Sequence, residues 1–309
     1  MSSEQQTADN SENVSLKRGY LYAIGSYVLW GLLPIYWKLL GSASVFEIFA
    51  HRMLWSFVFM FVICRFIRKI DLMPLFKDRR AMLILGLAGI SVAGTWGLYI
   101  YAINSNHVLE ASLGYYINPL VAILFGVLIF KEKLTLFQKI ATVLAAIGVI
   151  YFTIDYGRLP WISLALALLF GIYGALKKWG GYPATPALAV ETTLVAPFAV
   201  IFVTATFFLP GREFLAPDAV STGWLDTVLL IGGGALTAIP LLLFAKAANV
   251  VPLSWMGFLQ YVSPTLTLLL GVFAFGEQFT TAHAVCFAFI WIGLVLISIE
   301  MLRGLQQQK

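Results

Sequence analysis

The feature that most constrains this sequence is a series of ten apolar segments joined by short polar connections. Each segment is close to the ~20 residues that an α-helix needs to cross the hydrocarbon core of a bilayer. Only 11% of the residues are charged, against about 25% in soluble domains, so a soluble fold is excluded. The sequence therefore predicts an all-α integral membrane protein with ten transmembrane helices. Their predicted limits are residues 19–40, 44–66, 81–103, 108–130, 135–154, 159–179, 185–209, 224–246, 250–275 and 280–302.

The positions of lysine and arginine predict the orientation of these helices. Cytoplasmic connections of membrane proteins are enriched in these two residues. Sixteen of the 20 basic residues lie on the side of the N-terminus, and only Arg158 and Arg212 lie in connections on the other side. We therefore predict that both termini are cytoplasmic, with a disordered tail at residues 1–16 and a short tail at residues 304–309. Because the cations form no stripe on one face, we expect no nucleic-acid partner.

An internal repeat divides the chain into two halves. When the sequence is shifted by 145 positions, the segment from Asn104 matches the segment from Asn249 without a gap. We therefore predict two five-helix repeats, at residues 17–155 and 156–303. Because five is odd, the second repeat enters the membrane from the opposite side, and such inverted repeats are typical of transporters that work by alternating access. The matching pairs include Tyr116 with Tyr261, Pro119 with Pro264, Glu132 with Glu277 and Thr135 with Thr280, and at offsets of 144 and 140 Glu47 matches Glu191 and Lys38 matches Lys178.

Several of these features together are similar to a known family. The two five-helix repeats, the mid-span prolines and the Glu–Thr pairs resemble the EamA-type drug/metabolite transporter superfamily. Within it, the run from Trp30 to Lys38 (WGLLPIYWK), Glu47 and the run from Ala50 to Ser56 (AHRMLWS) resemble RarD-type permeases. The resemblance implies a multi-pass transporter of the bacterial inner membrane, and it supplies no physiological substrate.

Arg52 is the most informative single residue, because it lies about 12 Å along the second segment, near the bilayer centre. A cation at that depth costs ~2.5–3.5 kcal/mol, so such residues usually face a cavity or a partner. A guanidinium suits a carboxylate or phosphate through paired hydrogen bonds. We therefore expect Arg52 to bind a carboxylate-bearing substrate. The alternatives are a structural ion pair, with Glu191 as the competing partner, or a side chain that reaches back to the interface.

Three further polar residues near Arg52 are candidates for proton coupling. Glu47 and His51 are four residues apart, so they share one face of a helix. A histidine beside a carboxylate is a suitable proton carrier near neutral pH, and Lys38 is a third candidate. The sequence equally fits Glu47 and Lys38 as interfacial charges that pair across a tight hairpin, with His51 as a packed polar residue.

Aromatic and polar residues near the two mid-span prolines are candidates for the wall of a substrate cavity. A tyrosine precedes each proline by three residues, where the repeat brings both helices toward a common axis, and a polar residue directly precedes each proline. Tryptophan rings elsewhere in the first half can stack on flat or cationic groups. The candidate wall residues are Trp30, Trp96, Tyr116, Asn118, Tyr261 and Ser263.

The remaining chemistry in the sequence is sparse. Glu132 and Glu277 end their segments on opposite faces, which predicts helix-end caps or gate pairs. Cys64 and Cys286 lie inside apolar segments with no metal-ligand spacing. The chain also lacks Walker, Rossmann, His-Glu-x-x-His and Gly-x-Ser-x-Gly motifs. We therefore expect no metal, no cofactor and no enzymatic activity.

These observations favour a secondary transporter of the bacterial inner membrane. We expect it to move small metabolites, such as amino acids, by alternating access, and most consistently as an exporter. The main alternative is a passive channel or facilitator, because inverted repeats with kinked central helices also occur in pores. An intramembrane enzyme is disfavoured, because the only aspartate inside a predicted segment is Asp226, at the start of 224–246, so no aspartate pair is available for a protease. The partners expected are a small-molecule substrate and the lipid bilayer, and the sequence leaves open the coupling ion and a homodimer.

Overall fold

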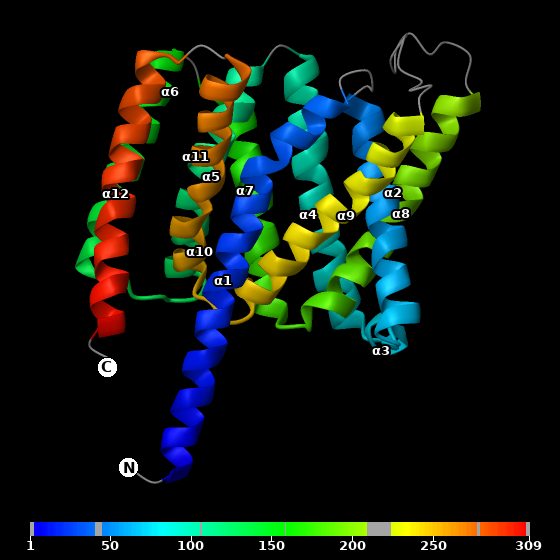
Figure 1. The fold of residues 1–309 in the computed structure, drawn as a ribbon, viewed down its shortest axis with the longest axis horizontal. Helices are drawn as coiled ribbons and strands as arrows, with labels where there is room; N and C mark the ends of the chain where they lie inside the picture. The colour runs from blue at the N-terminus through cyan, green and yellow to red at the C-terminus, as the bar shows by residue number, and fades with distance from the viewer. Residues whose placement is uncertain are drawn as a thin grey trace.

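The architecture is a bundle of long helices, seen in a computed structural model of the chain (Figure 1). The structure describes residues 3–40, 45–105, 107–157, 159–208, 224–276 and 279–306. Within these residues there is no β-strand, and the predicted all-α membrane fold is confirmed. The helices are α1 (Ser3–Leu39), α2 (Val45–Val62), α3 (Met73–Lys77), α4 (Arg79–Asn104), α5 (Val108–Leu128), α6 (Leu136–Tyr156), α7 (Trp161–Gly180), α8 (Ala184–Phe208), α9 (Trp224–Ala248), α10 (Leu253–Gln260), α11 (Val262–Leu269) and α12 (Thr281–Gln306), with π-helical turns at Ile63–Ile67 and Leu270–Ala274.

Nine helical stretches in the described part of the chain are long and apolar enough to cross a membrane. Helix α1 is not among them, because tyrosine, tryptophan and glycine dilute its apolar residues. It nevertheless runs through the bundle beside the others, and α1 begins at the same end of the bundle at which α12 ends (Figure 1). The predicted count of ten spans and the cytoplasmic termini stay predictions.

The tails predicted at residues 1–16 and 304–309 stay predictions. Helix α1 begins at Ser3, and its first turns extend beyond the bundle (Figure 1). At the other end, α12 continues to Gln306, past the limit predicted for the last span.

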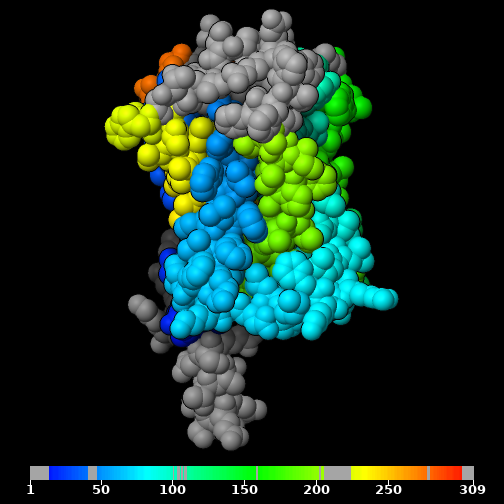
Figure 2. Space-filling view, turned by 90° about the vertical axis from the view of Figure 1, so that its right-hand side faces the viewer, coloured from blue at the N-terminus to red at the C-terminus, as the bar shows by residue number. Residues whose placement is uncertain are grey.

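The predicted repeat pairs α1 with α7, α2 with α8, α4 with α9, α5 with the α10–α11 pair, and α6 with α12, and its two units stay a prediction. Contacts between α1 and α9 have their counterpart between α4 and α7, and contacts between α2 and α9 have theirs between α4 and α8. The repeat-related helices α6 and α12 pack on each other. So do α2 and α8, which lie side by side on the face shown in Figure 2. The halves therefore interlock instead of forming two separate domains.

The two mid-span prolines have different effects on their helices. Helix α5 continues without a break through Pro119. In the second half, α10 ends at Gln260, and α11 begins at Val262, two residues before Pro264. A proline has no N–H to donate four residues back, and its ring crowds that carbonyl. The residue four positions before Pro264 is Gln260, which explains where the helix is interrupted.

Candidate functional site

Arg52 lies between two tryptophan rings that come from different helices. Its Cζ is 4.7 Å from the ring centroid of Trp37 on α1 and 4.8 Å from that of Trp96 on α4. A guanidinium packed within ~6 Å of an aromatic face gains about 0.5–2 kcal/mol. Two such contacts together are comparable with the ~2.5–3.5 kcal/mol that a cation costs at this depth. The protein itself therefore stabilises this half-buried charge.

Helix α9 approaches this stack closely because it carries three consecutive glycines at positions 232–234. A Cβ atom at Gly233 would lie only 3.3 Å from the ring of Trp37, so a larger residue would separate the helices. One turn further on, α9 supplies a hydrogen-bond partner for the cation. The Nε of Arg52 donates to the Thr237 hydroxyl at 3.0 Å, and that hydroxyl donates to the carbonyl of Gly233 at 2.7 Å.

The terminal nitrogens of Arg52 are not used by the described residues. Within the described ranges, the bond to Thr237 is the only hydrogen bond of Arg52, and no carboxylate lies within ion-pair distance of it. These two nitrogens form the edge of a guanidinium that binds a carboxylate in a bidentate manner. Tyr99 and Tyr115, whose rings meet at 5.8 Å, are close enough to interact electrostatically with the cation.

Glu191 does not pair with Arg52, contrary to the alternative that the sequence suggested. Its Oε1 lies 2.5 Å from the Nζ of Lys177 on α7, and both residues are buried, with exposed fractions of 1% and 5%. The count of basic residues had placed Lys177 on the cytoplasmic side, but its side chain lies inside the protein. Arg52 and Glu191 thus belong to two different polar clusters.

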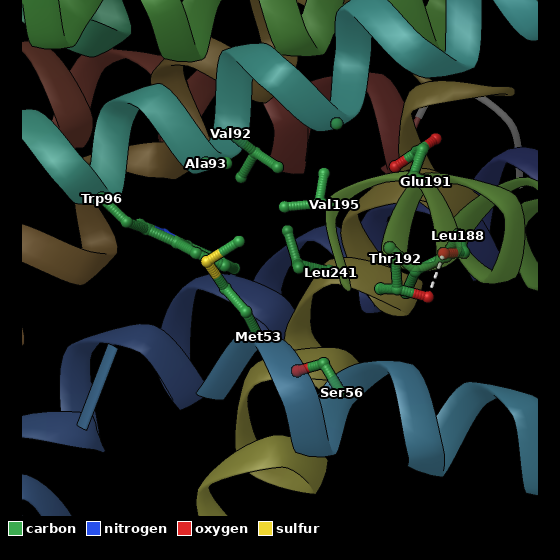
Figure 3. Close-up of a pocket in the computed structure, with 11 residues that line it drawn as sticks. Met53, Ser56, Val92, Ala93, Trp96, Leu188, Glu191, Thr192, Val195 and Leu241 are labelled. Atoms are coloured by element: carbon green, nitrogen blue, oxygen red, sulfur yellow. Dashed lines mark hydrogen bonds between the residues drawn. The ribbon is translucent and has the colours of Figure 1, made fainter. Parts of the chain in front are cut away.

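A small cavity lies beside Glu191, between α2, α4, α8 and α9 (Figure 3). Its wall is mostly apolar, with Ser56 and Thr192 as further polar residues. Trp96 also lines the cavity, so one indole ring contacts both this space and the guanidinium of Arg52.

The three candidates for proton coupling have separate surroundings. The Nδ1 of His51 accepts a hydrogen bond from the indole N–H of Trp55 at 3.1 Å. Lys38 is exposed, and its Nζ lies 3.9 Å from the ring centroid of Phe275. Glu47 lies half-buried in the first turn of α2. Their role in proton coupling stays a prediction.

The repeat-related residues Tyr116 and Tyr261 contact each other. The hydroxyl of Tyr261 donates to the carbonyl of Tyr116 at 3.3 Å. Both side chains are buried, and the ring of Tyr116 packs edge-on against Phe287 at 5.0 Å. Neither tyrosine lines the cavity beside Glu191, and their contact with substrate stays a prediction.

The other predicted wall residues are also packed within the bundle. Asn118 is buried, and its Oδ1 has no hydrogen-bond partner in the part of the chain that the structure describes. Ser263 is half-buried. The ring of Trp30 packs at 5.6 Å against Phe170 and at 5.8 Å against Phe244. The structure thus brings Trp96, but not these residues, next to Arg52.

Glu132 binds the N-terminus of α10. Its two carboxylate oxygens accept hydrogen bonds from the backbone N–H groups of Leu253 at 2.7 Å and Ser254 at 2.8 Å. The Nζ of Lys178 lies 3.5 Å from the same carboxylate. A residue of the first half thereby holds a helix of the second. Its repeat counterpart Glu277 lies outside the described residues.

Three residues of these clusters were not among the predicted site residues. Trp37 lies within the run that carries the family resemblance, and that signal could have identified it. Lys177 directly precedes Lys178, which the repeat matches with Lys38, so the repeat already marked this end of α7. Nothing in the sequence marks Thr237.

Comparison with known proteins agrees with this architecture. An uncharacterized transporter, YojE of Bacillus subtilis, is 40% identical over 96% of this chain and 99% of its own. Proteins named RarD are 38% identical in Streptomyces exfoliatus, over 95% of this chain and 92% of theirs, and 36% identical in Escherichia coli, over 92% and 95%. A solved crystal structure with 18% identity has the same fold, with a TM-score of 0.71 over 92% of this chain and 98% of that chain.

The fold and these relatives define a multi-pass transport protein of the bacterial inner membrane. The EamA-like transporter family matches residues 17–154, which are almost the whole of the first predicted repeat. The chain belongs to this family, among its RarD-type permeases.

Proposed function

We propose that the protein is a secondary transporter that exports small carboxylate-bearing metabolites, such as amino acids, by alternating access. The observation that supports this substrate class is the Arg52 cluster. Two indole faces hold the guanidinium, and its Nε bonds to Thr237. The in-plane terminal nitrogens stay free for two parallel hydrogen bonds to a carboxylate.

The aromatic stack also explains how Arg52 can release its substrate. If a carboxylate of the protein formed an ion pair with Arg52, a carboxylate substrate could bind only by displacing it. Each transport cycle would then have to separate two buried charges of the protein. Here the π faces of Trp37 and Trp96 stabilise the cation when the carboxylate has left. The empty and occupied forms of the site are therefore both accessible, as a transport cycle requires.

Binding to purified protein tests this proposal. The probes are amino acids and their carboxamides, which keep the side chain and lose the negative charge, with tryptophan fluorescence as the readout beside Arg52. Arg52→Lys keeps the charge but loses the planar pair of donors, so we expect about 10- to 100-fold weaker binding of the acids. Arg65→Lys is the control, since Arg65 is exposed in the π-helical turn that follows α2. Equal binding of acids and carboxamides would contradict the proposal.

Transport in proteoliposomes separates a carrier from a channel. A carrier that works by alternating access saturates with substrate and shows counterflow, in which unlabelled substrate inside drives uptake of labelled substrate. A passive channel shows neither. His51→Gln and Glu47→Gln test the proposed proton coupling in the same assay, because each should weaken transport driven by a pH gradient.

A further inference from the structure

The ion pair between Lys177 and Glu191 is so deeply buried that its energetic cost calls for a functional explanation. Both side chains are almost inaccessible, with exposed fractions of 3% and 2%, and their charged atoms are 2.5 Å apart. Removing two charges from water costs several kcal/mol per ion, and replacing such a pair with apolar residues is often neutral or stabilising. Ionisable residues inside a membrane span accordingly mark ion or proton pathways more often than structural supports.

The pair is also incompletely hydrogen-bonded. Oε1 of Glu191 accepts from Lys177, but Oε2 has no hydrogen-bond partner in the described part of the protein. The hydroxyl of Tyr173, one turn before Lys177, is likewise buried without a partner there, although it interacts electrostatically with Glu191. Buried polar atoms are nearly always satisfied in folded proteins. Oε2 of Glu191 can therefore accept a hydrogen bond from the nearby Tyr173 hydroxyl while it is ionised, or carry a proton of its own.

Glu191 lines the cavity described above, although its Oε2 atom is itself enclosed. The cavity measures about 30 Å³, and a water molecule needs about 10–15 Å³, so the cavity has room for water but not for a metabolite. Figure 3 shows Glu191 at one side of the lining residues and Met53 and Trp96 at the other, with Val195 and Leu241 between them. The lining residues from α2, α4 and α9 carry no titratable side chain. The titratable groups that face Glu191 are thus Lys177 and Tyr173, both from α7.

We propose that Glu191 is a proton-binding site whose protonation breaks its ion pair with Lys177. A hydronium ion that reaches the cavity transfers its proton to Oε2 of Glu191 and leaves as water. The new O–H group can donate to the Tyr173 hydroxyl oxygen, which gives both orphaned atoms a partner. Lys177 stays an ammonium ion but loses its counter-charge.

Protonation of Glu191 would change the contact between helices α7 and α8. Lys177 lies in the last turn of α7 and Glu191 two turns into α8, so the ion pair links the two helices of this hairpin. Loss of the pair loosens the hairpin in the second half only. The inference rests on the proposed function only where it assigns the proton to coupled transport, because proton binding itself needs no substrate.

Infrared difference spectroscopy of the purified protein, without substrate, tests proton binding. Between about pH 8 and pH 5.5, exposed carboxylates stay ionised, so a protonated-carboxyl band that appears on acidification reports a buried group. We expect this band in the wild type and its loss in Glu191→Gln. Glu110→Gln is the matched control. Glu110 is equally buried, but its oxygens accept from the Tyr156 hydroxyl at 2.8 Å and the Ile162 N–H at 3.1 Å.

Two results would overturn the proposal: a wild type without such a band in this pH range, or a band of unchanged amplitude in Glu191→Gln. Should Glu191→Gln fail to fold, Glu191→Asp keeps a carboxyl group in a new environment and must shift the band. An unshifted band there would also overturn the assignment.

Proteoliposomes then test the coupling. In the wild type, a pH gradient should raise uptake of an amino acid above its value without a gradient. In Glu191→Gln the ratio of the two rates should fall to about one, and in Glu110→Gln it should stay at the wild-type value. A wild-type ratio in Glu191→Gln would overturn the coupling role. A failure of the Arg52 proposal would appear in substrate binding and would leave the infrared result unchanged.

Discussion

Replacement of Glu132 tests how the two halves of the protein are joined. Helix α10 begins after Pro252, whose side chain caps nothing, so the first N–H groups of the helix depend on an outside acceptor. Glu132 supplies it with both oxygens, at 2.7 Å and 2.8 Å from two consecutive backbone nitrogens. The carboxylate also faces the positive end of the helix dipole. We expect Glu132→Ala to leave two N–H groups unsatisfied.

The magnitude follows from these contacts. A hydrogen bond to a charged group contributes ~1.5–3 kcal/mol, so the loss of two half-buried ones should cost about 3 kcal/mol of unfolding free energy. Glu132→Gln keeps one acceptor oxygen, but its NH₂ group would face a second donor, so we expect about half that loss. Equilibrium unfolding in mixed detergent micelles, followed by tryptophan fluorescence, measures both.

The matched control is Glu300→Ala. Glu300 also accepts a side-chain bond, from the Thr135 hydroxyl at 2.9 Å, but at an exposed position. Its loss should change the unfolding free energy by no more than about 0.5 kcal/mol. If Glu132→Ala costs no more than Glu300→Ala, then the Glu132 contacts do not hold α10, and our account of this junction is wrong.

Three further predictions concern packing, the aromatic stack and topology. Gly234→Ala would place a Cβ on the backbone of α2 and should lower the unfolding free energy by ~1–3 kcal/mol, whereas Gly86→Ala, with its nearest neighbour at 3.7 Å, should have little effect. In a double-mutant cycle of Trp96→Leu with Arg52→Met, a coupling energy of about 1–2 kcal/mol is expected from the cation–π contact, and additive effects would contradict it. A reporter fused after Leu215 should lie outside the cytoplasm, and a cytoplasmic signal would refute the ten-span topology.

The spans were predictable because the thickness of the bilayer fixes their length. The apolar segments predicted at 108–130 and 224–246 correspond to helices Val108–Leu128 and Trp224–Ala248. The N-terminal helix was not predictable in this way. Residues 3–16 carry no apolar pattern, and their helix is a continuation of α1 outside the bundle.

The depth of Arg52 was evident from the sequence, but its partners were not. Trp37, Trp96 and Thr237 come from three other helices, and which faces meet depends on the rotation and tilt of each helix. The sequence argument assumed that a buried cation needs a carboxylate, and two indole faces fulfil that need instead. Aromatic rings stabilise Arg52 without an opposite charge, so no acidic residue in the sequence marks its partners.

Lys177 was misplaced for a geometric reason. It lies in the last turn of α7, and we counted such residues as cytoplasmic because long basic side chains often reach toward the interface. Side chains on a helix point toward its N-terminus, however. At the C-terminal end of α7 that direction leads back into the bundle, toward Glu191.

The two halves share a packing plan but carry their buried charges at different positions, and this asymmetry bears on the transport cycle. The repeat places Trp37 opposite Lys177 and Arg52 opposite Ala196. Two identical halves that exchange conformations would make the inward-open and outward-open states equal in free energy. The Arg52 cluster has no counterpart around Ala196, so the two states of the proposed cycle are not equivalent by symmetry, and ~1.4 kcal/mol of difference changes their ratio tenfold. A proton on Glu191 would act on one half alone, and only such a one-sided event can shift the balance between the two states.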